Sequence, residues 1–443
     1  MNKLIALSIC SIVSLTAMGQ SRSFTLSEAQ DYALTHSLQA KASRLDVVSA
    51  QATVRQTTAI GLPQISGTIN YQEFIDIPTS LIPAEFFGGE PGEFAEVQFG
   101  TKYNASGELN ASQLIFDGSY IVGLKAAKVY SKLAAKSHER TEREIKATVA
   151  ETYYLILVAE ENLSILKKTY ENIEQSVFEI SKLYEAGFVE ETEKDQIQLT
   201  LNQVKTNIDK VERQVKLAYD LFRYQLGIDL QTEIALTDNL EGVMSSLNPE
   251  LLMSRSLDLE QHVDFQLAQT QTNLQKLNFR KEQVANLPSI ALFASHTQNA
   301  QRNQFNFGRS DKEWYPTTVY GFTMNIPIFS SGSRYQTSKL ARISWEKAML
   351  EEEMMRENLK LQEKQSRDNF LNAVSSYQNE EKNINLALKI FNTSLIKYRE
   401  GLITGLDLSQ AQNQLLQVQS SYINSILTYL QSKTAFEKAI NAL

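Results

Sequence analysis

The segment Tyr184-Glu185-Ala186-Gly187 returns 214 residues later as Tyr398-Arg399-Glu400-Gly401. After each glycine, apolar residues recur at steps of three and four, from Ile197 to Phe222 in the first copy and from Ala411 to Phe436 in the second. Such spacing is typical of one face of a helix. A repeat of more than 200 residues is too long for a solenoid unit. The sequence therefore predicts a duplicated half-molecule in which a long helical hairpin turns at each glycine.

Two further pairs of motifs support the duplication. Leu62-Pro63 is matched by Leu287-Pro288, and Gln113-Leu114-Ile115-Phe116 is matched by Ile326-Pro327-Ile328-Phe329. Each Leu-Pro pair follows a helical pattern and stops it, because proline cannot continue a helix. We expect helices over residues 26–61 and 250–286 ahead of these stops.

Alternation with a period of two follows each stop and predicts strands. Four are expected, at about 64–76, 97–113, 289–298 and 317–328. The clearest runs from Phe99 to Ala111, where small and aromatic residues alternate with polar ones. Strands of ~9–11 residues with this pattern are typical of transmembrane barrels. The alternative is an ordinary hairpin on a soluble core. Residues 77–96, rich in Pro, Gly and Phe, are expected to form a loop.

Two very long helices are predicted. The first is expected from Asp117 to Tyr184, where an apolar seam from Ile145 to Tyr184 steps by fours and threes. The second is expected from about 333 to Tyr398, with a similar seam from Phe370 to Leu395. This heptad pattern predicts coiled-coil packing. A helix of ~68 residues would span roughly 100 Å, which no small globular domain accommodates.

The first 19 residues have the features of a secretory signal peptide. Lys3 is basic, Leu4 to Leu15 form a short apolar run, and small residues precede a cleavage point before Gln20. Cys10, the only cysteine of the sequence, lies inside this segment. The exported chain is therefore expected to contain no disulfide.

Composition excludes several classes of function. The 443 residues carry a net charge of −8, which argues against nucleic-acid binding. No catalytic constellation or phosphate-binding glycine loop is present. The four histidines are scattered, without the spacing of metal ligands (His36, His138, His262, His296). We expect no enzyme activity, no cofactor and no metal site.

Four strands in one chain cannot close a membrane barrel, because the smallest such barrels have 8 strands and an open edge in lipid leaves backbone groups unpaired. The chain is therefore expected to assemble. A trimer with 12 strands and a dimer with 8 strands would each close.

The order of these features resembles the TolC family of outer-membrane efflux proteins. The segments that carry the resemblance are the opening helix, the two strand-to-helix junctions and the Tyr-x-x-Gly turns (Leu26-Ser27-Glu28-Ala29-Gln30-Asp31-Tyr32-Ala33-Leu34; Leu114-Ile115-Phe116-Asp117-Gly118; Ile326-Pro327-Ile328-Phe329-Ser330-Ser331-Gly332). It covers essentially all of the chain after the signal segment.

The resemblance implies a mainly α fold with a membrane β part. As a homotrimer, the chain would form a 12-stranded β-barrel continuous with an α-helical barrel, in the outer membrane with a long periplasmic extension. Residues 20–230 and 250–443 would be the two structural repeats, joined by a linker at 231–249. The implied partners are a periplasmic adaptor (membrane fusion protein) and an inner-membrane transporter of the RND, ABC or MFS type. The implied function is the exit duct of a tripartite efflux or type I secretion system.

The resemblance also assigns candidate gate residues. Asp407 matches an aspartate of the periplasmic aperture, Glu193 holds the equivalent place in the first repeat, and Asp195 lies nearby. Tyr398 matches a gate tyrosine, and Tyr184 is its repeat equivalent. The position of the arginine that pairs with the gate tyrosine in the family is occupied by Ile403, so this tyrosine–arginine contact is expected to be absent. Three Asp407 carboxylates would form a ring that attracts cations, whereas the alternative is a set of solvated turn carboxylates.

Gly187 and Gly401 have two interpretations. In the first, each glycine only ends a helix at its C-terminus. In the second, each turn is also where the adaptor would bind. A competing interpretation of the whole chain is a soluble periplasmic coiled-coil scaffold or adaptor. The strand pair distinguishes the two, because a scaffold would not require a lipid-compatible face.

Overall fold

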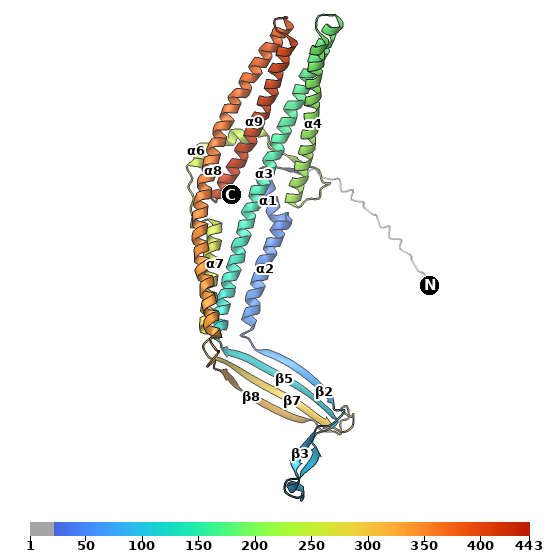
Figure 1. Cartoon of the computed structure of the whole chain (residues 1–443), viewed down its shortest axis with the longest axis vertical. Coiled ribbons are helices and arrows are strands. Elements are labelled where there is room, and N and C mark those ends of the chain that lie inside the picture. The colour runs from blue at the N-terminus through green and yellow to red at the C-terminus, as the bar shows by residue number, and fades with distance from the viewer. Residues whose placement is uncertain (1–21) are drawn as a thin grey trace, which may run out of the picture. The chain divides into compact units, whose positions relative to one another are not determined.

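A computed structural model describes residues 22–443. The predicted signal segment at 1–19, with Cys10, lies outside the described residues. The described chain forms two compact units (Figure 1). One contains the residues up to Asp46 together with 136–267 and 353–443, and the other contains 47–135 and 268–352. Each unit draws on both halves of the duplicated sequence.

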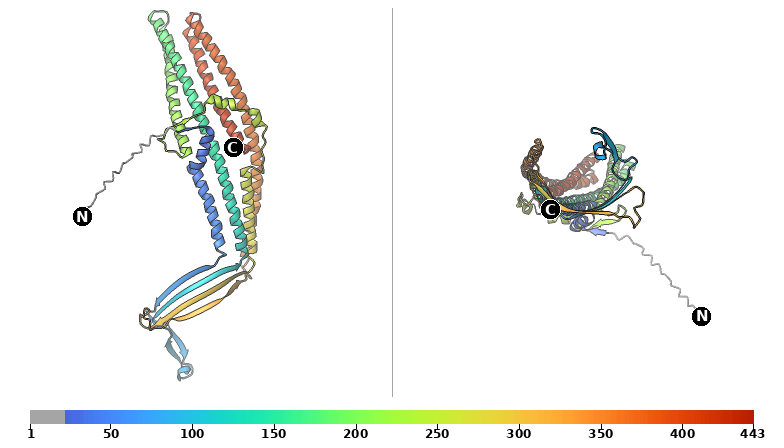
Figure 2. Two further views of the ribbon diagram at one scale, coloured as in Figure 1. Left: turned by 180° about the vertical axis from the view of Figure 1, so that it is seen from behind. Right: turned by 90° about the horizontal axis from the view of Figure 1, so that it is seen from below.

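The unit around residues 47–135 and 268–352 holds a four-stranded antiparallel sheet (Figure 2). Its strands are β2 (Gln64–Glu73), β5 (Tyr103–Phe116), β7 (Ser289–Arg302) and β8 (Tyr315–Asn325), in the order β2-β5-β7-β8. Each half of the sequence contributes two neighbouring strands, and the β5–β7 pairing joins the halves. The outer edges of β2 and β8 pair with no strand of the described chain.

The register separates the side chains of this sheet by polarity. Ile65 lies opposite Ala111, Gly67 opposite Leu109 and Leu292 opposite Phe322, so these residues share one face. This face is apolar and open to solvent in the single chain, with Ile69 88% and Tyr320 87% exposed. The opposite face carries mostly polar residues (among them Ser66, Thr68, Asn70, Ser106, Asn110, Ser295, Thr297, Thr323).

The prediction of a loop at 77–96 is wrong, because this segment has regular secondary structure. It contains a hairpin of β3 (Thr79–Pro83) and β4 (Phe94–Gln98) around a 3-10 helix, Ala84–Phe87. The strand expected from 97 begins only at Tyr103. Gly100 has φ 135°, a conformation that few other residues adopt, and it separates β4 from β5.

Two predicted helices are interrupted. The helix expected over 26–61 is α1 (Leu26–His36) and α2 (Leu38–Ala59). Ser37 between them is extended, and its hydroxyl accepts a hydrogen bond from Ala40 N at 3.1 Å, as a helix N-cap does. The helix expected over 250–286 is α6 (Pro249–Met253) and α7 (Val263–Val284), with non-helical residues between them.

The two long helices are continuous. They are α3 (Gly118–Glu185), with 68 residues, and α8 (Ser333–Arg399), with 67 residues. Each turns into an antiparallel partner, α4 (Glu191–Leu226) or α9 (Gly405–Ala439). We call α3–α4 the first hairpin and α8–α9 the second hairpin.

The heptad seams form the cores of both hairpins. In the first, residues of α3 pack on residues of α4 (Leu166, Ile173, Ile180 with Ile197, Val204, Val211). In the second, Ala387 and Phe391 of α8 pack with Leu408 and Leu415 of α9. Burying one such aliphatic side chain contributes ~1.5–3 kcal/mol, so packing rather than helix propensity holds these long helices.

The linker expected at 231–249 has structure of its own. It contains β6 (Ile234–Leu236), which pairs in parallel with β1 (Arg22–Phe24), and α5 (Leu240–Ser246). Asp238 accepts hydrogen bonds from Leu26 N at 3.0 Å and from the hydroxyl of Tyr153 at 2.7 Å. These bonds fasten the start of the described chain to α3. No helix among residues 22–443 has the length and apolar character needed to cross a bilayer.

Candidate functional site at the tips of the helical hairpins

The tips of both hairpins end in the same backbone turn. Gly187 N donates to Tyr184 O at 2.9 Å and Phe188 N donates to Leu183 O at 2.9 Å. The bonds that close the second turn, from Gly401 and Leu402, repeat this pattern. The glycines have φ 78° and 71°, the left-handed conformation of a Schellman cap. Both glycines therefore end a helix, while their role in adaptor binding stays a prediction.

Asp407 lies in a capping box at the start of α9. Its carboxylate accepts from Thr404 N at 3.0 Å and from Thr404 Oγ1 at 2.8 Å, and Asp407 N donates back to Thr404 Oγ1 at 3.3 Å. These bonds from Thr404 hold the pKa of the exposed Asp407 carboxyl below its ordinary value. The side chain is thus fixed at the tip and charged at neutral pH.

Glu193 joins the two hairpins. Its carboxylate, on the first turn of α4, accepts a hydrogen bond from Gly405 N of α9 at 3.2 Å. Gly405 is the first residue of α9, where backbone N–H groups are unpaired within the helix and favour a negative partner. A Cβ at Gly405 would collide with this carboxylate. The contact therefore depends on glycine at 405 as well as on the acid at 193.

A second link between the hairpins uses an arginine that the sequence did not reveal. Arg399 Nη2 of α8 lies 3.3 Å from Glu179 Oε1 of α3. The arginine expected from the resembled family falls at Ile403, which has no polar side chain. The bridge is half exposed, so its own contribution is at most about 1 kcal/mol. Residues 220 positions apart carry no signal of pairing in a single sequence.

Tyr398 contacts both hairpins through its ring. It packs against the apolar core of the first hairpin and against that of the second. Its hydroxyl is buried and has no hydrogen-bond partner among the described residues. Burial, and then the negative charges of Glu193 and Glu179, raise the pKa of this phenol. The ring, rather than a hydroxyl bond, therefore ties Tyr398 into the tips.

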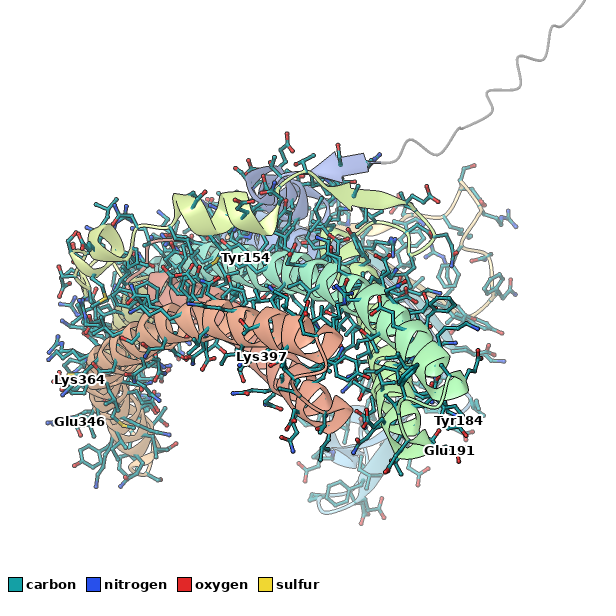
Figure 3. The ribbon with its side chains drawn as sticks, turned by 90° about the horizontal axis from the view of Figure 1, so that it is seen from above. Tyr154, Tyr184, Glu191, Glu346, Lys364 and Lys397 are labelled. Carbon is teal, nitrogen blue, oxygen red and sulfur yellow. The ribbon has the colours of Figure 1, made fainter. Side chains whose placement is uncertain are left out.

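Tyr184 and Asp195 are not brought to the second hairpin. Lys194 Nζ lies 4.6 Å above the Tyr184 ring and 3.8 Å from Asp195 Oδ1, so all three interact within the first hairpin. Figure 3 shows Tyr184 and Glu191 together at the tip of that hairpin. Of the five predicted gate residues, only Glu193 and Tyr398 contact both hairpins.

Each tip exposes a large apolar side chain directly after its turn glycine. Phe188 is 79% exposed and Leu402 is 72% exposed. They follow Gly187 and Gly401 directly, at equivalent positions of the repeat. The duplication itself was the signal that could have identified them, because a solvated turn has no need of an apolar residue at both copies.

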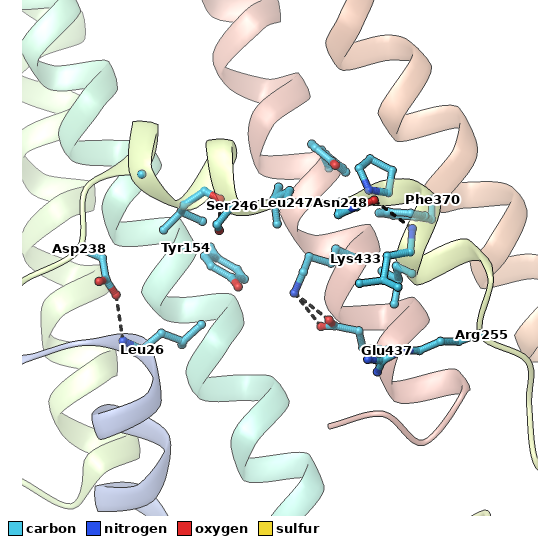
Figure 4. Close-up of a pocket in the computed structure, with 16 residues that line it drawn as sticks. Leu26, Tyr154, Asp238, Ser246, Leu247, Asn248, Arg255, Phe370, Lys433 and Glu437 are labelled. Carbon is cyan, nitrogen blue, oxygen red and sulfur yellow. Dashed lines mark hydrogen bonds and ion pairs between the residues drawn. The ribbon is translucent and has the colours of Figure 1, made fainter.

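A cavity of about 670 Å³ lies beneath α5 and α6, against α3 and α9 (Figure 4). Two of the charged groups in its wall have partners: Lys433 Nζ lies 2.8 Å from Glu437 Oε1, and Asp238 accepts a hydrogen bond from Leu26 N. Among residues 22–443, no three His, Cys, Asp or Glu side chains are grouped to hold a metal ion.

The chain is similar to known proteins in both sequence and fold. The family described as "Outer membrane efflux protein" matches residues 30–221 and 255–442. "Outer membrane protein TolC" of Vibrio cholerae is 18% identical over 339 residues, which are 76% of this chain and 77% of that protein.

Solved structures with the same fold include three bacterial membrane proteins. A structure of CusC has a TM-score of 0.75 at 17% identity, covering 94% of this chain and 92% of CusC. VceC from Vibrio cholerae has a TM-score of 0.72 at 16% identity, covering 94% and 95% of the two chains. The open state of the MtrE channel of Neisseria gonorrhoeae has a TM-score of 0.74 at 14% identity, covering 94% and 88%.

Proposed function

Because the chain belongs to the outer membrane efflux protein family, we propose that it forms the homotrimeric exit duct of a tripartite efflux or type I secretion system. Members of this family are channels in the outer membrane, with an extended helical part in the periplasm, and not enzymes. An outer-membrane location excludes the soluble scaffold considered above.

The observation that supports this proposal most directly is that the four-stranded sheet of the described chain has two edge strands, β2 and β8, each unpaired on its outer side. The free edges of β2 and β8 expose backbone groups that lipid cannot satisfy. The apolar face through Ile69 and Tyr320 suits lipid, and the polar face suits water. Antiparallel pairing of β8 with β2 of the next copy would satisfy both edges, and three copies would supply twelve strands.

Exposed apolar seams on the helices favour the same assembly. On α8, Leu350 is 67%, Met354 70% and Leu361 63% exposed at coiled-coil spacing. On α4, Leu217 and Tyr224 are similarly open. Isolated in one chain, these seams are solvated apolar stripes. Side by side in a trimer, they would bury one another and complete a helical wall.

The links between hairpins would act as a latch at the periplasmic end. Glu193 with Gly405, and Glu179 with Arg399, hold the tips together in each copy. Releasing these links would let the hairpins separate and widen the aperture. In a trimer the three exposed Asp407 carboxylates would face a shared axis and attract cations.

The tips also suit the proposed partners. Phe188 and Leu402 project from the two turns and would insert into apolar pockets of a periplasmic adaptor, with Gly187 and Gly401 holding them in place. The adaptor would connect the duct to an RND, ABC or MFS transporter of the inner membrane, which selects the substrate.

The test is fractionation of cells that express the full chain, followed by electrophoresis without boiling and bilayer recording. A trimer in the outer membrane that conducts ions is expected. A monomer in the soluble periplasmic fraction would contradict the proposal. Cross-linking from cysteines at Phe188 and Leu402 is expected to capture a periplasmic adaptor, and a cysteine at the exposed Gln414 provides the control.

A further inference from the structure

A second cavity lies between the two hairpins, part of the way along them. Its volume is about 300 Å³, and α3, α8 and α9 form its walls. This is the lower end of the range for small-molecule sites. We call it the inter-hairpin groove. Figure 1 shows the three helices that border it.

The floor of the groove is apolar. Leu388 and Phe391 of α8, Leu415 of α9 and Ile165 of α3 line it. Phe391 and Leu415 belong to the core of the second hairpin, so their positions are fixed by packing. The floor is therefore preformed and would accept an aromatic or aliphatic body.

A buried glutamine oxygen in the wall lacks a partner. Gln412 and Gln419 of α9 both line the groove, two turns apart, and Gln412 is only 3% exposed. The side-chain oxygen of Gln419 is buried and has no hydrogen-bond partner among the described residues. Buried polar groups are normally paired, and leaving one unpaired costs free energy. The unpaired oxygen of Gln419 thus points to a bound group that donates a hydrogen bond.

One charged side chain, Lys168 of α3, lines the groove, and it is exposed. Burial raises the pKa of Tyr422, which also lines the groove, and the negative charges of Glu381 and Glu161 raise it further. A ligand with one negative group would meet Lys168 while its body lay on the floor.

From these observations we infer that the inter-hairpin groove binds an amphipathic anion: a flat apolar body, an N–H or O–H donor for the Gln419 oxygen, and one acidic group for Lys168. A ligand in this groove touches both hairpins. It would therefore oppose their separation wherever the protein is located, so the inference does not rest on the proposed transport function.

Two probes test this inference, and they differ by one group. 8-Anilinonaphthalene-1-sulfonate has the rings, the N–H and a sulfonate, whereas N-phenyl-1-naphthylamine lacks the sulfonate. Titration calorimetry and fluorescence would be performed on the full chain in phosphatidylcholine nanodiscs, with empty nanodiscs subtracted. Saturable binding of one sulfonate probe per protomer is expected, several-fold tighter than binding of the neutral probe.

Three variants locate the site. Asn392→Trp fills the groove from its exposed rim and is expected to weaken both probes about tenfold. Asn413→Trp places the same residue on an exposed position of α9 outside the groove and should leave both affinities within about twofold. Lys168→Met should weaken the sulfonate probe by roughly fivefold, as for an exposed ion pair, and leave the neutral probe unchanged.

If the Asn392→Trp and Asn413→Trp variants bound the probes with equal affinity, the assignment of the binding site to the inter-hairpin groove would be refuted. Absence of saturable binding would show that only water occupies the groove, and would overturn it too. An unchanged affinity of Lys168→Met for the sulfonate probe would overturn the assignment to an anion. Circular dichroism of each variant shows whether it has folded before its titration is read.

Discussion

Glu193→Ala is the substitution with the most direct consequence for the hairpin tips. It removes the carboxylate that accepts from Gly405 N at 3.2 Å and leaves a partly buried N–H at the start of α9 without its partner. Hydrogen bonds to charged groups contribute ~1.5–3 kcal/mol. Glu193 is only half-buried, so we take the lower value, about 1.5 kcal/mol per protomer. This corresponds to roughly a tenfold shift towards separated tips in each copy.

The assay is single-channel recording of the purified protein in planar bilayers at fixed salt. Glu193→Ala should raise the conductance or the fraction of time spent open. Glu193→Gln should lie between it and the unsubstituted protein, because a neutral oxygen still accepts the bond but more weakly.

The matched control is Glu191→Ala. Glu191 is on the same turn with the same charge, and its ion-pair partner is Lys194 of its own helix, at 3.7 Å. Removing it changes the net charge of the tip by the same amount without touching the second hairpin. If Glu191→Ala and Glu193→Ala gave the same conductance, the effect would come from charge alone and the latch would be refuted.

Four further substitutions test other features of the protein. Asp407→Ala should weaken block of the channel by multivalent cations, and an unchanged block would remove the acidic ring. Because Thr404 holds the pKa of Asp407 below its ordinary value, that block should persist as pH falls from 7 and fade only below pH ~4. Tyr398→Phe should leave the conductance unchanged and the melting temperature equal or higher, since the lost hydroxyl is buried and unpaired; a marked gain in conductance would show that the hydroxyl has a partner in the assembly. Phe322→Arg on the apolar face of β8 should lower the stability of the protein in the bilayer by ~2–4 kcal/mol and reduce the amount of folded protein in membranes. Thr323→Arg on the polar face should be tolerated. Equal yields of the two variants would contradict our assignment of the faces.

The long helices could be predicted because a heptad seam is a local pattern. The seam from Ile145 to Tyr184 indicated a helix that was predicted from Asp117 to Tyr184, and α3 runs from Gly118 to Glu185. The same reasoning holds for α8. The mainly helical class with a smaller β part is confirmed by the fold of the related channels.

The interruptions could not be predicted with equal success. Around Ser37 the helical pattern continues on both sides, and only the cap on Ala40 N reveals the break. The β3–β4 hairpin was missed because its strands are short and glycine and proline surround them. In both places, local hydrogen bonds override a periodicity that is averaged over many residues.

The site illustrates the same limit. Gly187 and Gly401 were predicted as helix ends, since a glycine after a seam has a local meaning. The contacts of Glu193 with Gly405 and of Arg399 with Glu179 join segments more than 200 residues apart, so they required the three-dimensional fold. The division into repeats at 20–230 and 250–443 stays a proposal, and the two compact units cross it.

The central claim is that several copies complete one wall by pairing β8 of each with β2 of the next. The exported chain is expected to contain no native thiol, so a cysteine at Thr68 on β2 and another at Thr317, Val319 or Gly321 on β8 would report that pairing by disulfide formation in the oxidising cell envelope. The account predicts, for at least one of these pairs, a covalent ladder in the outer-membrane fraction that ends at three chains. A ladder that ends at two chains, or the absence of cross-links for every pair, would contradict it.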